Sequence, residues 1–271
     1  MEKEFLDEYE KRTRNILVSV SCLTYNHEKF IEEALDSFLA QKTDFGFEII
    51  VHDDASTDRT PDIIREYTAR HPDIIRPIFQ TENQFSKTGV YPSAAFTFSQ
   101  ARGRYIAECD GDDYWTDPGK LQKQADFLEA NPDFSMCFHT YKILMENGLM
   151  VEPSLAQPHD YSPDELVAYQ INGYDIHTST KMFRNLYPTH RQDMLDFCGD
   201  YALTVLMGLH GKAKHLPDIA PSIYRKHPGN SWSGKPQAFI NAKMKALHQR
   251  LYELIKQKGN DRHIALRRKF L

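Results

Sequence analysis

A repeated alternation of strand-like, polar-turn and helix-like segments constrains the fold of this chain most strongly. The strand-like segments are short and nearly continuously apolar or β-branched, and they comprise residues 16–23, 47–52, 74–79 and 105–108. Helix-like segments follow the first three, over residues 30–41, from residue 60, and over residues 92–101. Strands buried on both faces and joined by helices form parallel sheets. The pattern therefore predicts an α/β fold with a mostly parallel, doubly wound, Rossmann-like central sheet flanked by helices.

The fourth strand-like segment ends in an acidic turn, Asp110 to Asp113, with the sequence DGDD. Three carboxylates within four positions repel one another, so a cation is expected beside them. Oxygen ligands at a strand end suit Mg²⁺ or Mn²⁺, which proteins hold with one or two carboxylates and a substrate's phosphate oxygens. The alternative is a polar turn before a helix, since Asp117 and Pro118 make a good N-cap and first helical residue. That alternative accounts for Asp117 alone.

Polar turns also follow the first two strands. Thr24, Tyr25 and Asn26 follow the first, and Asp53 and Asp54 follow the second. The carboxyl ends of parallel strands meet at one edge of a sheet, where ligands bind, so these turns and the acidic turn are expected to line one cleft. The tyrosine is well placed there to stack on a planar base. Local hydrogen bonds within the turn are the alternative for the two aspartates, and Asn26 is also expected to cap the next helix.

The bulk composition is that of an ordinary globular protein. The 271 residues are 41% hydrophobic and 26% charged, and the formal net charge of −5 implies no general attraction for nucleic acid. The apolar run at 16–23 is too short to span a bilayer, and the acidic first ten residues are unlike a signal peptide, so a cytoplasmic location is expected. The cysteines, which lie far apart and predict reduced thiols rather than a zinc site, are Cys22, Cys109, Cys137 and Cys198.

Three segments in this order, residues 18–41 (VSVSCLTYNHEKFIEEALDSFLAQ), 47–60 (FEIIVHDDASTDRT) and 103–132 (GRYIAECDGDDYWTDPGKLQKQADFLEANP), resemble the family 2 glycosyltransferases. These are nucleotide-sugar-dependent enzymes with the GT-A fold, and the resemblance covers about the first 135 residues closely. It implies inversion of the anomeric configuration and a divalent metal, Mn²⁺ or Mg²⁺, at the DxD motif.

The resemblance also implies roles for individual residues. It places a carboxylate of Asp53 or Asp54 on the ring N–H of uracil, Asp112 on the metal, and Asp110 near the ribose or the metal. Asp113 is expected at the sugar or in support of the loop. The full set of residues expected to bind the nucleotide sugar is Thr24, Tyr25, Asn26, Asp53, Asp54, Asp110 and Asp113. Arg102 and Arg104 are expected either to face a phosphate or to lie in solvent.

The second half of the chain is expected to hold the acceptor. It combines a strand-like segment at 134–144, a proline-rich loop at 147–161, a second strand at 176–183 and a third at 220–224. A capping box at Ser162 predicts a helix between the loop and the second strand.

Asp200 is the candidate catalytic base. Inverting transfer needs a carboxylate on the face of the sugar opposite the departing diphosphate, to take the acceptor's proton. The resemblance places an acidic residue at the head of a helix after the acceptor strand, and Gly199 and Asp200 begin such a helix. An ordinary N-cap is the alternative reading of Asp200, and Asp193 and Asp196 are neighbouring candidates for the base.

The polar loop 225–234 resembles the Tyr-Arg-x-His-x-Gly stretch of soluble family members, and His227 in it is a further candidate metal ligand. Residues 237–258 predict an amphipathic helix with lysines on one face, and a basic tail follows it. Packing of this helix on the domain or on a second subunit is preferred to a place on an anionic membrane surface.

These patterns together predict a GT-A domain over residues 1–234 and a C-terminal amphipathic, basic helical extension over 235–271. Within the domain, the nucleotide-sugar half is about 15–135 and the acceptor half about 136–234. The predicted function is inverting, metal-dependent transfer of a sugar from a nucleoside diphosphate sugar, UDP being favoured, to a glycan or lipid-linked acceptor in surface polysaccharide or lipopolysaccharide assembly. A catalytically inactive sugar-nucleotide-binding module and a nucleotidyltransferase are the alternatives. Peripheral association with the inner membrane face and homo-oligomerisation stay open.

Overall fold

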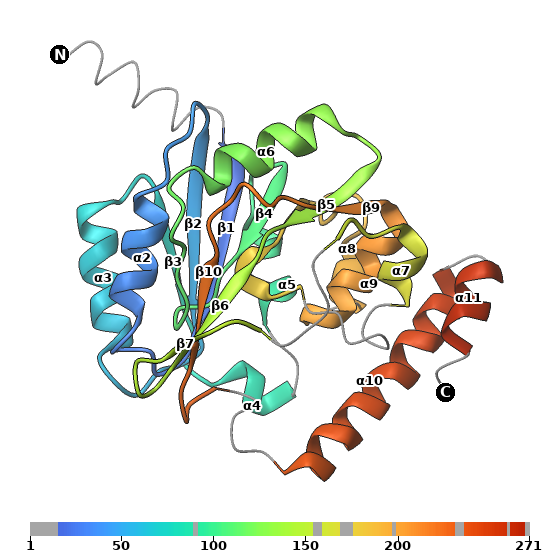
Figure 1. Cartoon of the computed structure of the whole chain (residues 1–271). Helices are drawn as coiled ribbons and strands as arrows, with labels where there is room; N and C mark the ends of the chain where they lie inside the picture. Colours follow the sequence, from blue (N-terminus) through green and yellow to red (C-terminus); the bar gives the residue numbers. More distant parts are fainter. Residues whose placement is uncertain are drawn as a thin grey trace.

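The central sheet of the computed structural model contains seven strands in the order β3-β2-β1-β4-β8-β5-β9 (Figure 1). The structure describes residues 16–88, 92–153, 159–168, 176–196, 199–230, 236–258 and 261–268. The strands of this sheet are β1 (Ile16–Thr24), β2 (Gly46–Asp53), β3 (Ile75–Phe79), β4 (Tyr105–Glu108), β5 (Phe134–Phe138), β8 (Met182–Arg184) and β9 (Lys212–His215).

The strand pairing is mostly parallel, as the sequence predicts. β1 is parallel to both β2 and β4, and β2 is parallel to β3. The exception is β8, which runs antiparallel to both of its neighbours, β4 and β5. A separate three-stranded sheet has the order β10-β6-β7, formed by β10 (Ser222–Lys226), β6 (Tyr141–Met145) and β7 (Met150–Val151). The predicted strand at 134–144 is therefore two strands in different sheets.

The sheet separates two hydrophobic cores, because side chains alternate between the faces of a strand. On β4, Tyr105 and Ala107 point into the first core and Ile106 points into the second. Two helices on one side of the sheet, α2 (Ile31–Leu39) and α3 (Thr60–Arg70), fill the first core together with α6 (Lys120–Ala130). The second core lies under α7 (Pro163–Val167) and α9 (Asp200–His210). Both faces are thus covered, which explains the continuous apolar runs.

Two predicted helix starts are wrong. Asn26 does not cap α2, which begins at Ile31 without a side-chain cap. Instead Asn26 adopts a left-handed conformation with φ 56°, and its Oδ1 accepts a hydrogen bond from Thr57 N at 2.8 Å. Likewise α6 begins after Gly119, not at Asp117. The Asp117 carboxylate accepts bonds from Gly119 N and from Ala220 N, so it joins this turn to the segment before β10.

Other predicted elements are shorter than expected. The helix expected at 92–101 is α5 (Ser93–Phe96) followed by a 3₁₀ turn at Phe98–Gln100, and α4 (Gln84–Thr88) lies in the loop before it. The strand expected at 176–183 is a 3₁₀ turn at Thr178–Thr180 followed by β8, and the strand expected at 220–224 is β10, which begins two residues later. The capping box at Ser162 is confirmed, with Glu165 as its partner.

The C-terminal segment is helical, with α10 (Gln237–Lys258) and α11 (Asp261–Arg268). In Figure 1, α10 runs from the region of α4 to that of α7 along the lower edge of the molecule. Leu251 and Ile255 of α10 are fully buried in the second core, so this helix packs on the domain. Within the described residues, none of the helices is both long enough and apolar enough to cross a membrane.

Candidate active site

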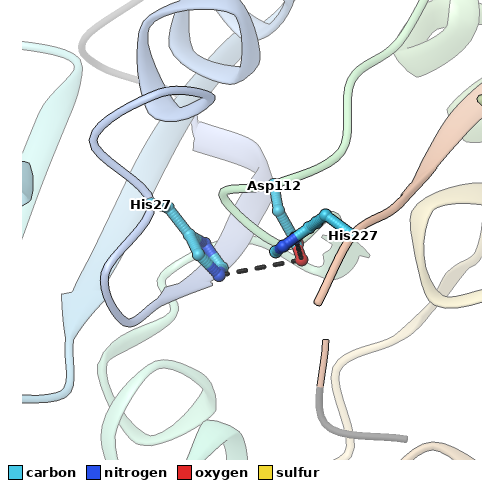
Figure 2. A group of neighbouring side chains, drawn as sticks. All are labelled: His27, Asp112 and His227. Atoms are coloured by element: carbon cyan, nitrogen blue, oxygen red, sulfur yellow. Dashed lines mark hydrogen bonds and ion pairs between the residues drawn. The ribbon is translucent and has the colours of Figure 1, made fainter. Parts of the chain in front are cut away.

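The carboxylate of Asp112 lies between two imidazole rings (Figure 2). Its Oδ2 is 3.0 Å from His227 Nε2 and 3.7 Å from His27 Nε2. One ligand atom from each of the three residues lies within 4.8 Å of the others. A carboxylate oxygen and two imidazole nitrogens in this arrangement are able to share one divalent cation. The structure thus brings together the predicted ligands Asp112 and His227, and adds His27, which sequence reasoning missed.

Three chain segments position these side chains. His27 follows the polar turn after β1, Asp112 follows β4, and His227 follows β10. Gly111 donates its backbone N–H to Leu23 O at 2.8 Å, which fixes the acidic turn against the end of β1. A Cβ at position 111 would lie 2.8 Å from Ile31 Cδ1, closer than side chains tolerate. A side chain at this position would displace the Ile31 methyl group, so glycine allows the acidic turn to pack closely against α2.

The segment of β10 is fastened to the acidic turn by a second set of contacts. Arg225 N donates to Asp113 Oδ1 at 2.9 Å, and Arg225 Nη1 donates to Asp112 O at 2.7 Å. Asn230 Nδ2 also donates to Asp112 Oδ2, at 3.0 Å. Asp113 is buried, and its carboxylate joins the acidic turn to β10, while its role towards a sugar stays a prediction.

Burial and neighbouring charges shift the pKa values of this cluster in opposite directions. Burial, then the charge of Asp112, raises the pKa values of Asp110 and Asp113 well above the ordinary value. Burial acts in the same sense on Asp112, but His27 and His227 outweigh it and lower the pKa of Asp112. Burial lowers the pKa of His27, which favours the neutral imidazole that binds a metal.

The two aspartates after β2 have different surroundings. Asp54 accepts hydrogen bonds from the backbone N–H groups of Gln84 and Phe85, at 2.7 and 3.0 Å. Asp53 accepts from Ser56, the local turn bonding that was the alternative for both. The two aspartates also differ in their access to a pocket of about 130 Å³. Asp54 lines this pocket, and Asp53 does not.

This pocket gathers most of the predicted nucleotide site. Its lining includes Thr24, Tyr25, Asp54, Asp110 and Asp112. The tyrosine side chain is 44% exposed, so its ring is available to a ligand. A wider cleft of about 740 Å³ adjoins it and is lined by Asn26 and His227, among others. The predicted residues therefore converge at one edge of the sheet, although their individual roles stay predictions.

Asp200 approaches the same strand end from the second core. It is the first residue of α9, the N-cap position is Gly199, and no side-chain cap bond forms. The alternative reading of Asp200 as an N-cap is therefore wrong. Its Oδ1 lies 3.8 Å from Lys181 Nζ, and its charge adds to those that raise the pKa of Asp110. Sequence reasoning missed Lys181, which comes directly before β8.

Other predicted candidates lie in structural contacts. Arg102 binds Glu48 and Arg104 binds Glu129, so both arginines are engaged in ion pairs. Asp196 is on α8 (Arg191–Asp196), where its backbone O accepts a bond from Arg250 of α10. Three of the four cysteines are buried free thiols, as predicted, and Cys198 lies outside the described residues.

Comparison with known proteins places this geometry in context. The family described as "Glycosyl transferase family 2" matches residues 19–187. The uncharacterized protein Rv1520 of Mycobacterium tuberculosis is 38% identical over 219 residues, which are 79% of this chain and 60% of that protein. The chain thus spans less than two thirds of the length of this relative. WfaP of Escherichia coli, named as a UDP-Glc:alpha-D-GlcNAc-diphosphoundecaprenol beta-1,3-glucosyltransferase, is 30% identical over 224 residues, which are 83% of each protein.

Solved structures share the fold. The chain matches S. aureus TarS in complex with UDP at a TM-score of 0.63 and 21% identity, covering 93% of this chain and 68% of that one. It matches the mannosyltransferase PcManGT of Pyrobaculum calidifontis, in complex with GDP-Man and Mn²⁺, at a TM-score of 0.60 and 19% identity, covering 95% and 70%. The predicted GT-A fold is confirmed. With more than half of its length matched by the family, this chain belongs to the family 2 glycosyltransferases.

Proposed function

We propose that this glycosyltransferase transfers a sugar from a nucleoside diphosphate sugar, preferably a UDP-sugar, to a hydroxyl group with inversion and with the help of a divalent metal. The acceptor is a glycan or a lipid-linked glycan of bacterial surface polysaccharide or lipopolysaccharide assembly. The observation that carries the proposal is Asp112 between His27 and His227, in the wall of the pocket that Tyr25 and Asp54 also line.

The donor set fits a metal ion. Imidazole suits softer divalent ions than Mg²⁺, and carboxylate suits both Mg²⁺ and Mn²⁺, so the mixed set formed by His27, Asp112 and His227 favours Mn²⁺. PcManGT, whose complex contains Mn²⁺, supports the same preference. When bound, the metal would neutralise the donor diphosphate and stabilise its departure. Asp110, in the same pocket wall, is the further candidate ligand.

The nucleotide would lie against Tyr25 and Asp54. The exposed tyrosine ring offers a stacking surface, and Asp54 is held rigidly because two backbone N–H groups bind its carboxylate. A fixed acceptor suits the ring N–H of uracil. WfaP, named with a UDP-Glc donor, and TarS, solved with UDP, support uridine over other bases.

Asp200 would act as the general base. A carboxylate oxygen of Asp200 takes the proton of the acceptor hydroxyl. At the same time the acceptor oxygen forms a bond to the anomeric carbon, and the bond between that carbon and the diphosphate breaks. At the head of α9 the Asp200 side chain is 47% exposed, so the carboxylate is accessible to an acceptor. The name of WfaP gives a lipid-linked diphosphate acceptor, which supports the proposed class of acceptor.

The test is a transfer assay with UDP-, GDP- and dTDP-sugars, Mn²⁺, and synthetic lipid-diphosphate sugars as acceptors. Release of nucleoside diphosphate gives the rate, and proton NMR of the product gives the anomeric configuration. We expect transfer from a UDP-sugar, a product of inverted configuration, and loss of transfer with chelator. Retention of configuration, or unchanged transfer with chelator, would overturn the corresponding part of the proposal.

A further inference from the structure

A buried lysine next to Asp200 has no part in the mechanism above. Lys181 Nζ lies 3.8 Å from Asp200 Oδ1 and 3.8 Å from Glu108 Oε2. Lys181 has no exposed surface, and Glu108 is 5% exposed. Among the described residues, neither Lys181 Nζ nor Glu108 Oε2 has a hydrogen-bond partner. Burying charged groups without such bonds is costly, so this arrangement calls for a function other than stability.

Strand pairing fixes the position of Lys181. In the antiparallel pair of β4 and β8, Ala107 lies opposite Met182, so the next pair is Glu108 and Lys181. Glu108 N donates to Lys181 O at 3.4 Å. Residues directly opposite in an antiparallel pair project from the same face, which brings the ammonium to the carboxylate. The preceding 3₁₀ turn, with Ser179 and Thr180 fully buried, holds the lysine backbone from the other side.

Asp200 itself lacks such support. Its side chain is half-exposed, the residue before it is Gly199 with φ 95°, and no cap bond holds its carboxylate. A half-exposed carboxylate samples several rotamers unless a partner selects one. Within the part of the chain that the structure describes, Lys181 Nζ is the charged partner of this carboxylate, and it approaches from the buried side.

We propose that Lys181 is a positioning residue: its buried ammonium selects the rotamer of Asp200 that faces the acceptor hydroxyl. This inference rests on the proposed role of Asp200 as the base. Glu108 balances the charge of the lysine within the core and does not itself touch the substrates. The alternative is that Lys181 serves only to neutralise Glu108.

The experiment compares K181M, E108Q and the double variant E108Q/K181M in the intact chain, with Mn²⁺ and the donor and acceptor found by the transfer assay. The double variant removes both buried charges and is expected to restore the thermal stability that K181M loses. We expect kcat of the double variant to stay roughly 10- to 100-fold below the wild type, the cost of a misplaced catalytic group, with an unchanged donor KM. E108Q keeps the contact between Lys181 and Asp200, so it is expected to keep kcat within about threefold of the wild type.

Two comparisons make the result specific. K120M removes a second lysine that is fully buried among the described residues; its Nζ is instead bonded to Gln124 Oε1 at 2.7 Å and lies over the Trp115 ring, so the substitution should leave kcat unchanged. In a D200N background, K181M should lower kcat no further, because its effect passes through Asp200. The inference would be overturned if the double variant had the kcat of the wild type, or if E108Q lowered kcat as much as K181M does. Either result would leave the proposed function standing. A wild-type enzyme that binds sugar nucleotide with metal but transfers nothing would overturn both.

Discussion

The two sides of the strand-end site are built by different physical means. On the proposed donor side, hydrogen bonds hold the two carboxylates that line the pocket: backbone N–H groups bind Asp54, and Asn230 and His227 bind Asp112. On the proposed acceptor side, Lys181 Nζ lies 3.8 Å from a carboxylate oxygen of Glu108 and 3.8 Å from one of Asp200, which are ion-pair contacts without a side-chain hydrogen bond. The donor side is thus largely preformed, whereas the acceptor side depends on charge balance and on what the substrates add.

This contrast suggests how the work of the site is divided. Hydrogen-bonded carboxylates hold their geometry before a ligand arrives. This suits recognition of the nucleoside diphosphate, which is the same in every catalytic cycle. A carboxylate whose rotamer is selected by a buried ammonium keeps its own lone pairs open to the acceptor hydroxyl, which suits proton transfer from an acceptor. Substitutions on the donor side should therefore change binding, and those on the acceptor side should change kcat.

The largest expected effect is that of D200N. Loss of a general base typically lowers the rate by 10²- to 10⁴-fold, so kcat should fall by about that factor. Binding of the sugar nucleotide should be unchanged, because Asp200 lies on the acceptor side. Steady-state kinetics and calorimetry of the same preparation separate the two quantities. Wild-type turnover by D200N would remove Asp200 from the mechanism and leave Asp193 and Asp196 to be tested.

The next largest effect concerns the metal ligands. Loss of a residue that only orients a metal ligand typically weakens metal binding by about 10- to 100-fold. H27N and H227N each remove a ligand itself, so each should weaken Mn²⁺ binding by more than that. Calorimetric titration of Mn²⁺ in the presence of the nucleotide measures this loss. The matched control is H52N, because His52 lines the same pocket but does not belong to the three-residue cluster. Equal losses in all three variants would argue against a site at Asp112.

A smaller effect is expected from the aspartates after β2. D54N should weaken UDP binding by about tenfold, the value of one lost charge-assisted hydrogen bond, and should also lower stability by about 1 kcal/mol through the N-terminus of α4. D53N should weaken UDP binding less, because Asp53 accepts from Ser56 outside the pocket. Nucleotide titrations of both variants rank them. A larger loss of UDP binding in D53N than in D54N would indicate that Asp53, not Asp54, contacts the uracil ring.

The last prediction concerns stability instead of activity, and it rests on the buried Lys120. Burial lowers the pKa of Lys120 to about 7, so the folded state loses this proton near neutrality while the unfolded state keeps it up to about pH 10. Between these values the unfolded state binds more protons, so stability should rise with pH relative to K120M, by at most about 1.4 kcal/mol per pH unit. Urea unfolding of both proteins from pH 7 to 10 measures the difference. A constant difference across this range would contradict the pKa shift.

The sequence predicted the donor side better than the acceptor side. Strand ends and their polar turns are local features, so Asp54, Tyr25 and Asp112 were found where the alternation placed them. His27 was missed because its importance depends on His227, which lies 200 residues further along the chain and meets it only through β10. The pairing of Glu108 with Lys181 depends on β8 running antiparallel in a sheet expected to be mostly parallel. Local capping signals also misled at Asn26 and Asp117, because tertiary hydrogen bonds use both side chains instead.

The most direct test of the account is the binding of UDP-sugars measured by thermal shift with Mn²⁺, with Mg²⁺ and with chelator, in the wild type and in D112N. A ligand that binds the folded state raises the apparent stability by mass action. We expect a UDP-sugar to stabilise the wild type with Mn²⁺, more weakly with Mg²⁺ and not with chelator, and to leave D112N unshifted. Stabilisation that is equal in chelator, or equal in D112N, would contradict a metal-dependent donor site at Asp112.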